Sequence, residues 1–243
     1  MIASDVRAAA VFDLDNTLVR GSSLFHFGRE MVRRRRLKAR HVIRFAGAEA
    51  GYVLRRGEPT GISSTVADRT LGLVSGMRQS DLLDLAVEFA ETRLHRHLSL
   101  QVYQQVIGFK RAGFTTVLAT ASPQELAGAV AAALGMSAAI GTVSEVTDGV
   151  YTGRLCGPVA HGPVKAQRVR ALMAEHGLDA GRSWAFSDSV NDLPLLTLVG
   201  NPVATNADPE LRAIARTNRW RELRRGDEAA SAAALQAFYP FAF

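Results

Sequence analysis

Four oxygen-bearing side chains follow short apolar runs in this sequence, at the points where buried strands are expected to end. They are Asp13 and Asp15 after the first run, Thr120 after another, and Asp188 after a third. Because ligand-binding groups in parallel α/β sheets lie beyond the carboxyl ends of the strands, we expect these side chains to converge. Clustered carboxylates raise one another's pKa unless a cation neutralises them, and oxygen ligands favour Mg²⁺. The pattern therefore indicates a magnesium site at one edge of a sheet.

The runs that must position these residues have the length of buried strands. They lie at 8–14, 115–119, 138–143, 183–187 and 202–205. Helical patterns at about 99–112 and 163–176 alternate with them, and Asp148-Gly149 between alternating residues predicts a hairpin. Short buried strands that alternate with helices predict an α/β fold, a Rossmann-like and mostly parallel sheet flanked by helices.

One helix between the second and third runs has clear boundary signals. Ser122 is predicted as its N-cap and Pro123 as its first residue. Glu125 would complete a capping box with Ser122, and Gly135 would end the helix. We therefore expect a helix that begins at Pro123, directly beyond the second strand.

About 95 residues separate the first two strands, which is more than a crossover between parallel strands requires. Such a crossover needs only about a dozen residues or more. Residues 21–95 are rich in Ala, Leu, Val, Arg and Glu and carry few strand signals, so we expect a helical insertion over the end of the first strand. The predicted parts are a catalytic core at 1–20 and 96–225, a helical cap domain at 21–95, and a peripheral tail at 226–243.

Positive charge is concentrated in one segment of the chain. The 243 residues carry a formal net charge of +6, and residues 21–60 contain ten lysines or arginines against three glutamates. Such a segment can meet nucleic acid, an anionic membrane or an anionic substrate, and it can equally be a solvated helix face. We expect no nucleic-acid partner, and we keep open a peripheral contact of the basic run 33–44 with an anionic membrane.

Cysteine content and hydropathy favour a cytoplasmic protein. Cys156 is the single cysteine, which excludes an intramolecular disulfide and favours a reducing compartment. The first residues lack the order of a secretory signal, and no run of about 18 apolar residues exists. We therefore expect a cytoplasmic location, and the oligomeric state stays open.

The order of the polar motifs resembles that of a known family. Four motifs carry the resemblance: D-x-D-x-T-L at 13–18, Thr120 at a strand end, Lys165 ahead of a helix, and D-x-x-N-D at 188–192. Together they look like the four motifs of the haloacid dehalogenase superfamily. The insertion after the first motif is similar to the helical (C1-type) cap of the phosphoserine-phosphatase-like branch, subfamily IB, and 206–220 looks like its closing segment.

The resemblance implies a phosphomonoester hydrolase with a covalent intermediate. Asp13 would be the nucleophile that forms an aspartyl-phosphate, and Asp15 would protonate the leaving oxygen and then activate water. Lys165 would balance the charge of the nucleophile and of the transferred group. Mg²⁺ would be held by Asp13, the backbone carbonyl of Asp15, and Asp188. Substrate or phosphate contacts would come from Thr120, Ala121, Ser122, the N–H groups at the following helix start, Ser22 and Ser23, with Thr17, Asn191 and Asp192 supporting the metal and Lys165.

The substrate is less constrained than the reaction. Phosphoserine phosphatases carry a Glu seven residues after the second Asp of the first motif, where this sequence has Ser22. This departure weakens the expectation that the chain recognises the ammonium group of serine. The candidates are a small phosphomonoester of the phosphoserine, histidinol phosphate or phosphocholine class, a lysophospholipid or other lipid phosphate, and transfer to another alcohol. The alternative from another class is a non-catalytic module that binds anionic surfaces.

Overall fold

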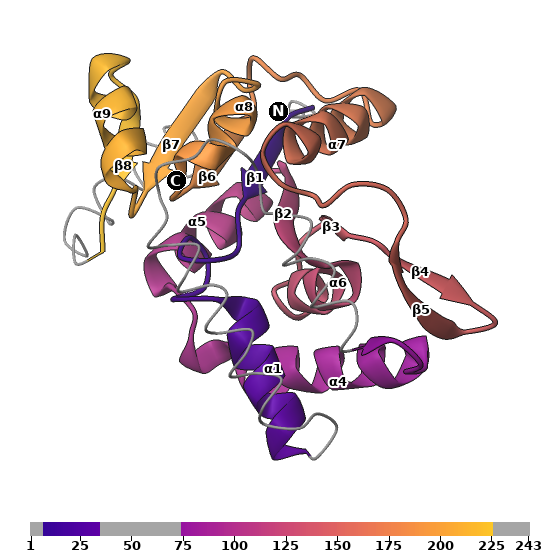
Figure 1. Cartoon of the computed structure of the whole chain (residues 1–243). Helices are drawn as coiled ribbons and strands as arrows, with labels where there is room; N and C mark the ends of the chain where they lie inside the picture. The colour runs from indigo at the N-terminus through magenta and orange to yellow at the C-terminus, as the bar shows by residue number, and fades with distance from the viewer. Residues whose placement is uncertain (1–6, 35–73, 226–243) are drawn as a thin grey trace.

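The computed structural model describes residues 7–34 and 74–225, and these residues form a six-stranded parallel sheet flanked by helices (Figure 1). The strands lie in the order β3-β2-β1-β6-β7-β8, and every paired neighbour is parallel. Their bounds are β1 Ala9–Phe12, β2 Thr115–Pro123, β3 Ala138–Thr142, β6 Trp184–Ser187, β7 Asn201–Thr205 and β8 Arg221–Leu223. The predicted Rossmann-like sheet is confirmed.

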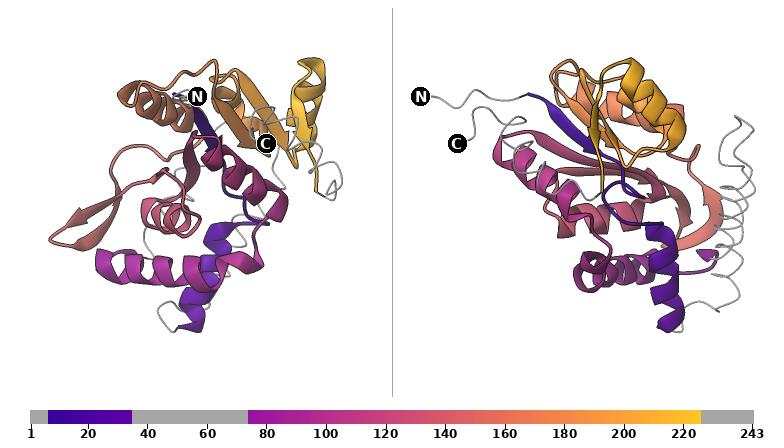
Figure 2. Two further views of the ribbon diagram at one scale, coloured as in Figure 1. Left: turned by 180° about the vertical axis from the view of Figure 1, so that it is seen from behind. Right: turned by 90° about the vertical axis from the view of Figure 1, so that its left-hand side faces the viewer.

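Helices cover both faces of the sheet (Figure 2). On one face, α7 (Gly162–Glu175), α8 (Leu193–Leu196) and α9 (Pro209–Thr217) contribute to one buried cluster that also contains Val11 and Val117. On the other face, α5 (Leu100–Arg111) and α6 (Gln124–Ala133) pack against Phe12 and Leu118. Consecutive β1 residues therefore point into different cores, as the two-residue period of a strand requires.

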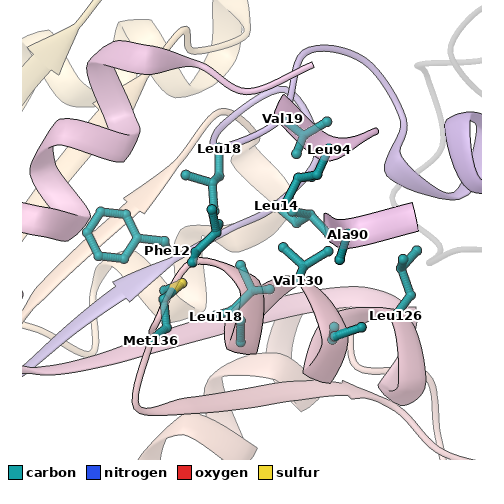
Figure 3. Close-up of a cluster of buried hydrophobic side chains, with 14 of the residues drawn as sticks. Phe12, Leu14, Leu18, Val19, Ala90, Leu94, Leu118, Leu126, Val130 and Met136 are labelled. Carbon is teal, nitrogen blue, oxygen red and sulfur yellow. The ribbon is translucent and has the colours of Figure 1, made fainter. Parts of the chain in front are cut away.

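Two further helices lie beyond α6, away from the sheet (Figure 1): α1 (Ser23–Arg33) and α4 (Gln79–Thr92), the latter followed by the short 3₁₀ helix η1 (Leu94–Arg96). Phe27 of α1 packs edge to face on Phe89 of α4, with ring centroids 5.6 Å apart. Both rings belong to the same buried cluster as Leu126 of α6, and Figure 3 shows Leu126 and Ala90 in this cluster. The two helices are thus joined to the core by continuous apolar packing.

The predicted division into core, cap and tail stays a prediction, because much of it falls outside the described residues. Residues 35–73 and the tail from 226 onward belong to that part, and so does the basic run 33–44 apart from Arg33 and Arg34. Within the described residues, no helix combines the length and the apolar character that crossing a membrane would require.

The predicted hairpin is confirmed. Strands β4 (Ser144–Thr147) and β5 (Val150–Leu155) are antiparallel and joined by two residues. Both have positive φ, 51° at Asp148 and 76° at Gly149. A two-residue turn of this kind requires left-handed backbone at both positions, which Asp and Gly tolerate best. The local sequence therefore supports the turn, and the Gln79 N–H, which donates to the Gly149 carbonyl at 2.9 Å, also holds it in place.

The predicted start of α6 is wrong by one residue, and its capping residue is not Ser122. Strand β2 continues through Pro123, which pairs with Thr142 of β3, so α6 begins at Gln124. Pro123 occupies the N-cap position and makes no side-chain cap hydrogen bond. The end is as expected, because Gly135 has φ 63° directly after the helix. Pairing with β3 therefore outweighs the local capping signal.

Candidate active site

The candidate site lies beyond the carboxyl ends of the three central strands, β2, β1 and β6. Phe12, the last residue of β1, is paired with Leu118 on one side and with Phe186 on the other. The next residue, Asp13, donates its backbone N–H to the Phe186 carbonyl at 2.9 Å. This bond holds the backbone of Asp13 beside the end of β6, where Asp188 follows two residues later.

Lys165 joins two of the predicted site carboxylates. Its Nζ donates to Asp13 Oδ1 and to Asp192 Oδ2, both at 2.7 Å. Burial would lower the pKa of Lys165, which is 3% exposed, but the charges of Asp13 and Asp192 outweigh burial and raise that pKa above its ordinary value. The lysine is therefore a fixed buried cation, placed there by the first turns of α7.

Asp192 lies at the end of the 3₁₀ helix η2 (Val190–Asp192) and is 2% exposed. Its Oδ2 also accepts a hydrogen bond from Ser187 Oγ at 2.7 Å, while its buried Oδ1 has no hydrogen-bond partner among the described residues. Asn191, predicted beside it, is exposed, and its side-chain amide donates to Ser189 Oγ at 3.2 Å. The structure thus brings Asp192 to the lysine, whereas Asn191 points to its own turn.

Burial and repulsion between neighbouring carboxylates raise the pKa values of the carboxyl groups at the site. Burial, countered by Lys165 and reinforced by Asp192, raises the pKa of Asp13 to about 7. Burial, reinforced by the charges of Asp13 and Asp192, raises the pKa of Asp188 to about 8. Burial also raises the pKa of Asp15, although the Ser23 hydrogen bonds partly offset it. The site therefore holds more acidic groups than its one lysine neutralises.

This excess of negative charge fits the predicted metal ion. No group of three or more His, Cys, Asp or Glu side chains with metal-binding geometry occurs within residues 7–34 and 74–225. The predicted ligands are instead two carboxylates, Asp13 and Asp188, and the backbone carbonyl of Asp15. Mg²⁺ is commonly held by one or two carboxylates and keeps several waters, so this smaller oxygen set suits it better than Zn²⁺.

Asp15 contacts the start of α1. Its Oδ1 accepts the backbone N–H of Ser23 at 2.6 Å, and Ser23 Oγ lies 3.1 Å from Ser122 Oγ. Ser22, predicted as a substrate contact, is the N-cap of α1, and its Oγ accepts the Phe25 N–H at 3.2 Å. The first turn of α1 is therefore anchored at the predicted catalytic edge, with Ser23 and Ser122 both buried.

The predicted phosphate-binding residues lie on the end of β2. Thr120 is 1% exposed, and its Oγ1 accepts the Ser122 N–H at 3.1 Å. The Ala121 carbonyl accepts a hydrogen bond from Thr142 Oγ1 at 2.7 Å. Ser122, predicted as a helix N-cap, lies instead in β2, within the irregular stretch between Ala119 and Pro123, which both pair with β3. Thr17 is fully buried, and its hydroxyl has no partner among the described residues.

Two polar residues near Lys165 were missed from the sequence. Ser187 closes β6 and donates to Asp192, and its place directly before Asp188 was the available signal. His161 is the N-cap residue of α7, where burial, reinforced by the charge of Lys165, lowers its pKa. The available signal was its position four residues before Lys165, at the start of the same helix. That signal does not show that the His161 side chain lies near the site, because this depends on tertiary packing.

Comparisons with known proteins agree with this geometry. The model of the haloacid dehalogenase-like hydrolase family matches residues 10–197. Phosphoserine phosphatase SerB1 of Mycobacterium tuberculosis is 39% identical over 216 residues, covering 89% of this chain and 70% of that protein. A histidinol-phosphatase of Neisseria meningitidis is 30% identical over 217 residues, covering 87% of this chain and 96% of that protein.

The chain also resembles a solved structure along most of its length. A crystal structure of a protein with unknown function from Bordetella pertussis has a TM-score of 0.77 and 32% identity, covering 90% of this chain and 98% of that one. The prediction of a phosphatase-type enzyme is confirmed, because relatives across this length carry phosphatase names. From the motifs, the fold and these matches together, the chain belongs to the haloacid dehalogenase-like hydrolase family.

Proposed function

We propose that this chain is a Mg²⁺-dependent phosphomonoester hydrolase that acts through an aspartyl-phosphate intermediate. The observation that carries the proposal is the buried contact of Lys165 Nζ with Asp13 Oδ1 at the end of β1. A carboxylate that attacks a phosphate dianion needs a fixed positive charge beside both groups. Lys165 supplies that charge without depending on solvent or on a flexible surface side chain.

Asp13 is the proposed nucleophile. One of its oxygens, Oδ1, is held by Lys165, which leaves Oδ2 as the oxygen that attacks phosphorus. The new bond joins Oδ2 to phosphorus while the bond from phosphorus to the leaving oxygen breaks. Water then attacks the phosphorus and releases the Asp13 carboxylate, so hydrolysis is divided into two displacements.

Asp15 is the proposed general acid and base. Its raised pKa favours the protonated form that can donate to the leaving oxygen. The ionised carboxylate left behind can then accept a proton from the attacking water. The 2.6 Å hydrogen bond from the Ser23 N–H stabilises this ionised form and fixes one of its oxygens.

The residues proposed to hold Mg²⁺ are Asp13, Asp188 and the backbone carbonyl of Asp15. The pKa of Asp188, raised by burial and then by the charge of Asp13, supports this placement, because a cation between the two carboxylates would remove their repulsion. When bound, Mg²⁺ supplies charge neutralisation and alignment of the phosphate group. Asp192 orients Lys165, from which it accepts a hydrogen bond, and is itself held by the Ser187 hydroxyl.

The proposed substrate is a small phosphomonoester. Support comes from the relatives named phosphoserine phosphatase and histidinol-phosphatase. Ser22 caps α1 where phosphoserine phosphatases carry a Glu, so a substrate other than phosphoserine is favoured. Lipid phosphates and transfer to an acceptor alcohol are alternatives within the same chemistry.

A direct assay tests the proposal. The protein should hydrolyse an aryl phosphate with Mg²⁺ and lose this activity in EDTA, and Asp13→Asn should abolish it. Asp84→Asn, an exposed change of the same kind on α4, should keep full activity. Turnover without metal, or full activity in Asp13→Asn, would refute the mechanism. A panel that includes phosphoserine, histidinol phosphate, phosphocholine and lysophosphatidate, with acceptor alcohols added, then identifies the substrate class.

A further inference from the structure

A cavity of about 400 Å³ lies between α1 and the segment formed by α4 and η1. We name it the basic cavity after the residues in its walls, chiefly His26, Arg29, Arg33, Arg93, Arg96 and His97. Its volume is within the range of sites for small organic molecules and is far larger than one water needs. None of the residues in the proposed catalytic set lines it.

The charges of the basic cavity are unbalanced within the described residues. Glu30, the one acid in its walls, is already bound by Arg33 and Arg34 and lies 3.8 Å from Arg93 Nε. These arginines lower the pKa of Glu30 to about 2, the Arg33 hydrogen bond having the largest effect. Of the wall arginines, Arg29 and Arg96 make no ion pair with a described carboxylate.

Two stacked imidazoles form another part of the wall. The rings of His26 and His97 are 3.6 Å apart at their centroids and inclined by 15°. Burial, together with the electrostatic effect of the neighbouring His26, Arg29 and Arg96 side chains, lowers the pKa of His97. The basic side chains around His97 are therefore close enough to influence one another electrostatically. Among the described residues, the cavity wall holds no acid besides Glu30 that would balance their charge. An anion in the cavity would supply the missing charge.

We propose that the basic cavity binds a small polyanion, a molecule with at least two phosphate or carboxylate groups. Arg29 comes from α1 and Arg96 from the end of η1, so two anionic groups could be held from different walls. Arginine is suited to this because its planar fork matches both phosphate and carboxylate oxygens. A cavity of about 400 Å³ suits a small molecule better than a nucleic acid or a membrane surface. The inference does not rest on the proposed phosphatase activity.

A ligand in the basic cavity would affect the stability of the protein, because the cavity lies beside a contact between two segments of the chain. The Arg20 N–H donates to the His97 carbonyl at 2.7 Å, and the Arg20 carbonyl lies 2.9 Å from His26 Nε2. The first contact joins the stretch that leads from Asp15 into α1 with the stretch that follows η1, and the second fixes the His26 ring against the same stretch. A ligand that bridges Arg29 and Arg96 would tie the same two stretches together and stabilise the folded protein.

Calorimetric titration of the full chain with inorganic pyrophosphate tests the inference, with citrate in parallel. Metal is removed with a chelating resin, because dissolved EDTA is itself a polyanion and because the metal-free catalytic carboxylates repel anions. We expect saturable 1:1 binding of at least one probe that weakens as salt rises from about 0.05 M to about 0.5 M. The double variant Arg29→Ala/Arg96→Ala should bind at least about tenfold more weakly.

Matched variants distinguish the basic cavity from other sites. Arg170→Ala/Arg182→Ala removes the same charge from exposed positions elsewhere and should bind as the wild type does. The imidazole NMR signals of the wild-type protein give a second measurement that does not depend on whether a variant folds. The signals of His26 and His97 should shift during the titration. Absence of binding by both probes, retained binding in the cavity variant, or shifts confined to His161 would overturn the inference.

Discussion

The ammonium group of Lys165 lies 2.7 Å from Oδ1 of Asp13, although the two residues are 152 positions apart in the sequence. Both are almost completely buried, and Asp192 completes the cluster at the same distance from the lysine. A buried ion pair of this kind is costly to break, because removing one partner leaves the other charge unpaired in a poorly solvated place. The cluster therefore links the chemistry of the site to the stability of the fold.

Lys165→Met should destabilise the protein and remove its activity. The variant keeps most of the side-chain volume but leaves Asp13 and Asp192 without their cation. We expect a loss of about 3–5 kcal/mol in unfolding free energy near neutral pH, measured in urea. The loss should be smaller at pH 5, where protons can neutralise the stranded carboxylates.

The matched control for this variant is Lys110→Met, which removes an exposed lysine from α5. It should change the unfolding free energy by no more than about 0.5 kcal/mol. Equal stability of Lys165→Met and the wild type at neutral pH would contradict the assignment of a buried, charged lysine.

Mg²⁺ should stabilise the protein more at pH 8 than at pH 5.5. The pKa values of Asp13 and Asp188, about 7 and about 8, lie above the ordinary value of 3.8. A carboxyl group whose pKa is raised by folding contributes stability below its unfolded pKa and loses it as pH rises through the folded pKa. The metal-free protein should therefore lose melting temperature between about pH 4 and pH 8.

Metal binding requires the ionised carboxylates, so added Mg²⁺ should restore this loss in the upper part of the pH range. Differential scanning fluorimetry with and without Mg²⁺ measures the effect directly. Asp188→Asn should reduce both the pH dependence and the Mg²⁺ response. A Mg²⁺ response of equal size at pH 5.5 and pH 8 would exclude these carboxylates as its source.

The main strands and the hairpin were predictable because their signals are local. Val11 and Phe12 belong to a short apolar run typical of a strand buried on both faces, and Asp148-Gly149 supports only a narrow set of turns. The convergence of Asp13, Lys165 and Asp192 was implied by the resemblance of the motifs to a known family, since Lys165 carries no local signal that would place it at the site.

Other features depend on contacts that no local pattern reveals. Pro123 stays in a strand because Thr142 lies opposite it, which overrides the capping signal at Ser122. Strand β8 is three residues long and contains Arg221 and Glu222, so its sequence lacks an apolar run. The basic cavity arises only when α1 packs beside the end of α4, and no spacing in the sequence indicates that arrangement.

The hydroxyl pair Ser23 and Ser122 should show energetic coupling between α1 and the end of β2. The two oxygens are 3.1 Å apart and both residues are buried. Each single change to Ala should cost about 1 kcal/mol of unfolding free energy, because the remaining hydroxyl loses a partner. The double variant should cost less than the sum, by about 0.5 kcal/mol or more. Strict additivity would indicate that the pair is absent in solution.

Glu30 should support the stability of the protein above about pH 4.5 and lose that effect in acid. Its pKa of about 2 lies below the ordinary value of 4.5, chiefly because of its hydrogen bond to Arg33 and, with smaller effects, Arg34 and Arg93. A carboxyl group with a pKa lowered by folding contributes stability above its unfolded pKa and loses it as pH falls toward the folded pKa.

Glu30→Gln should therefore lower the unfolding free energy by about 1 kcal/mol at pH 7, since the arginines are partly exposed and water screens the ion pairs. The difference between variant and wild type should shrink as pH falls from about 4.5 toward 3. Glu91→Gln, an exposed change on the same helical segment as Arg93, should show no such pH dependence. A stability difference that stays constant between pH 7 and pH 3 would mean that the charge of Glu30 is not what holds these arginines.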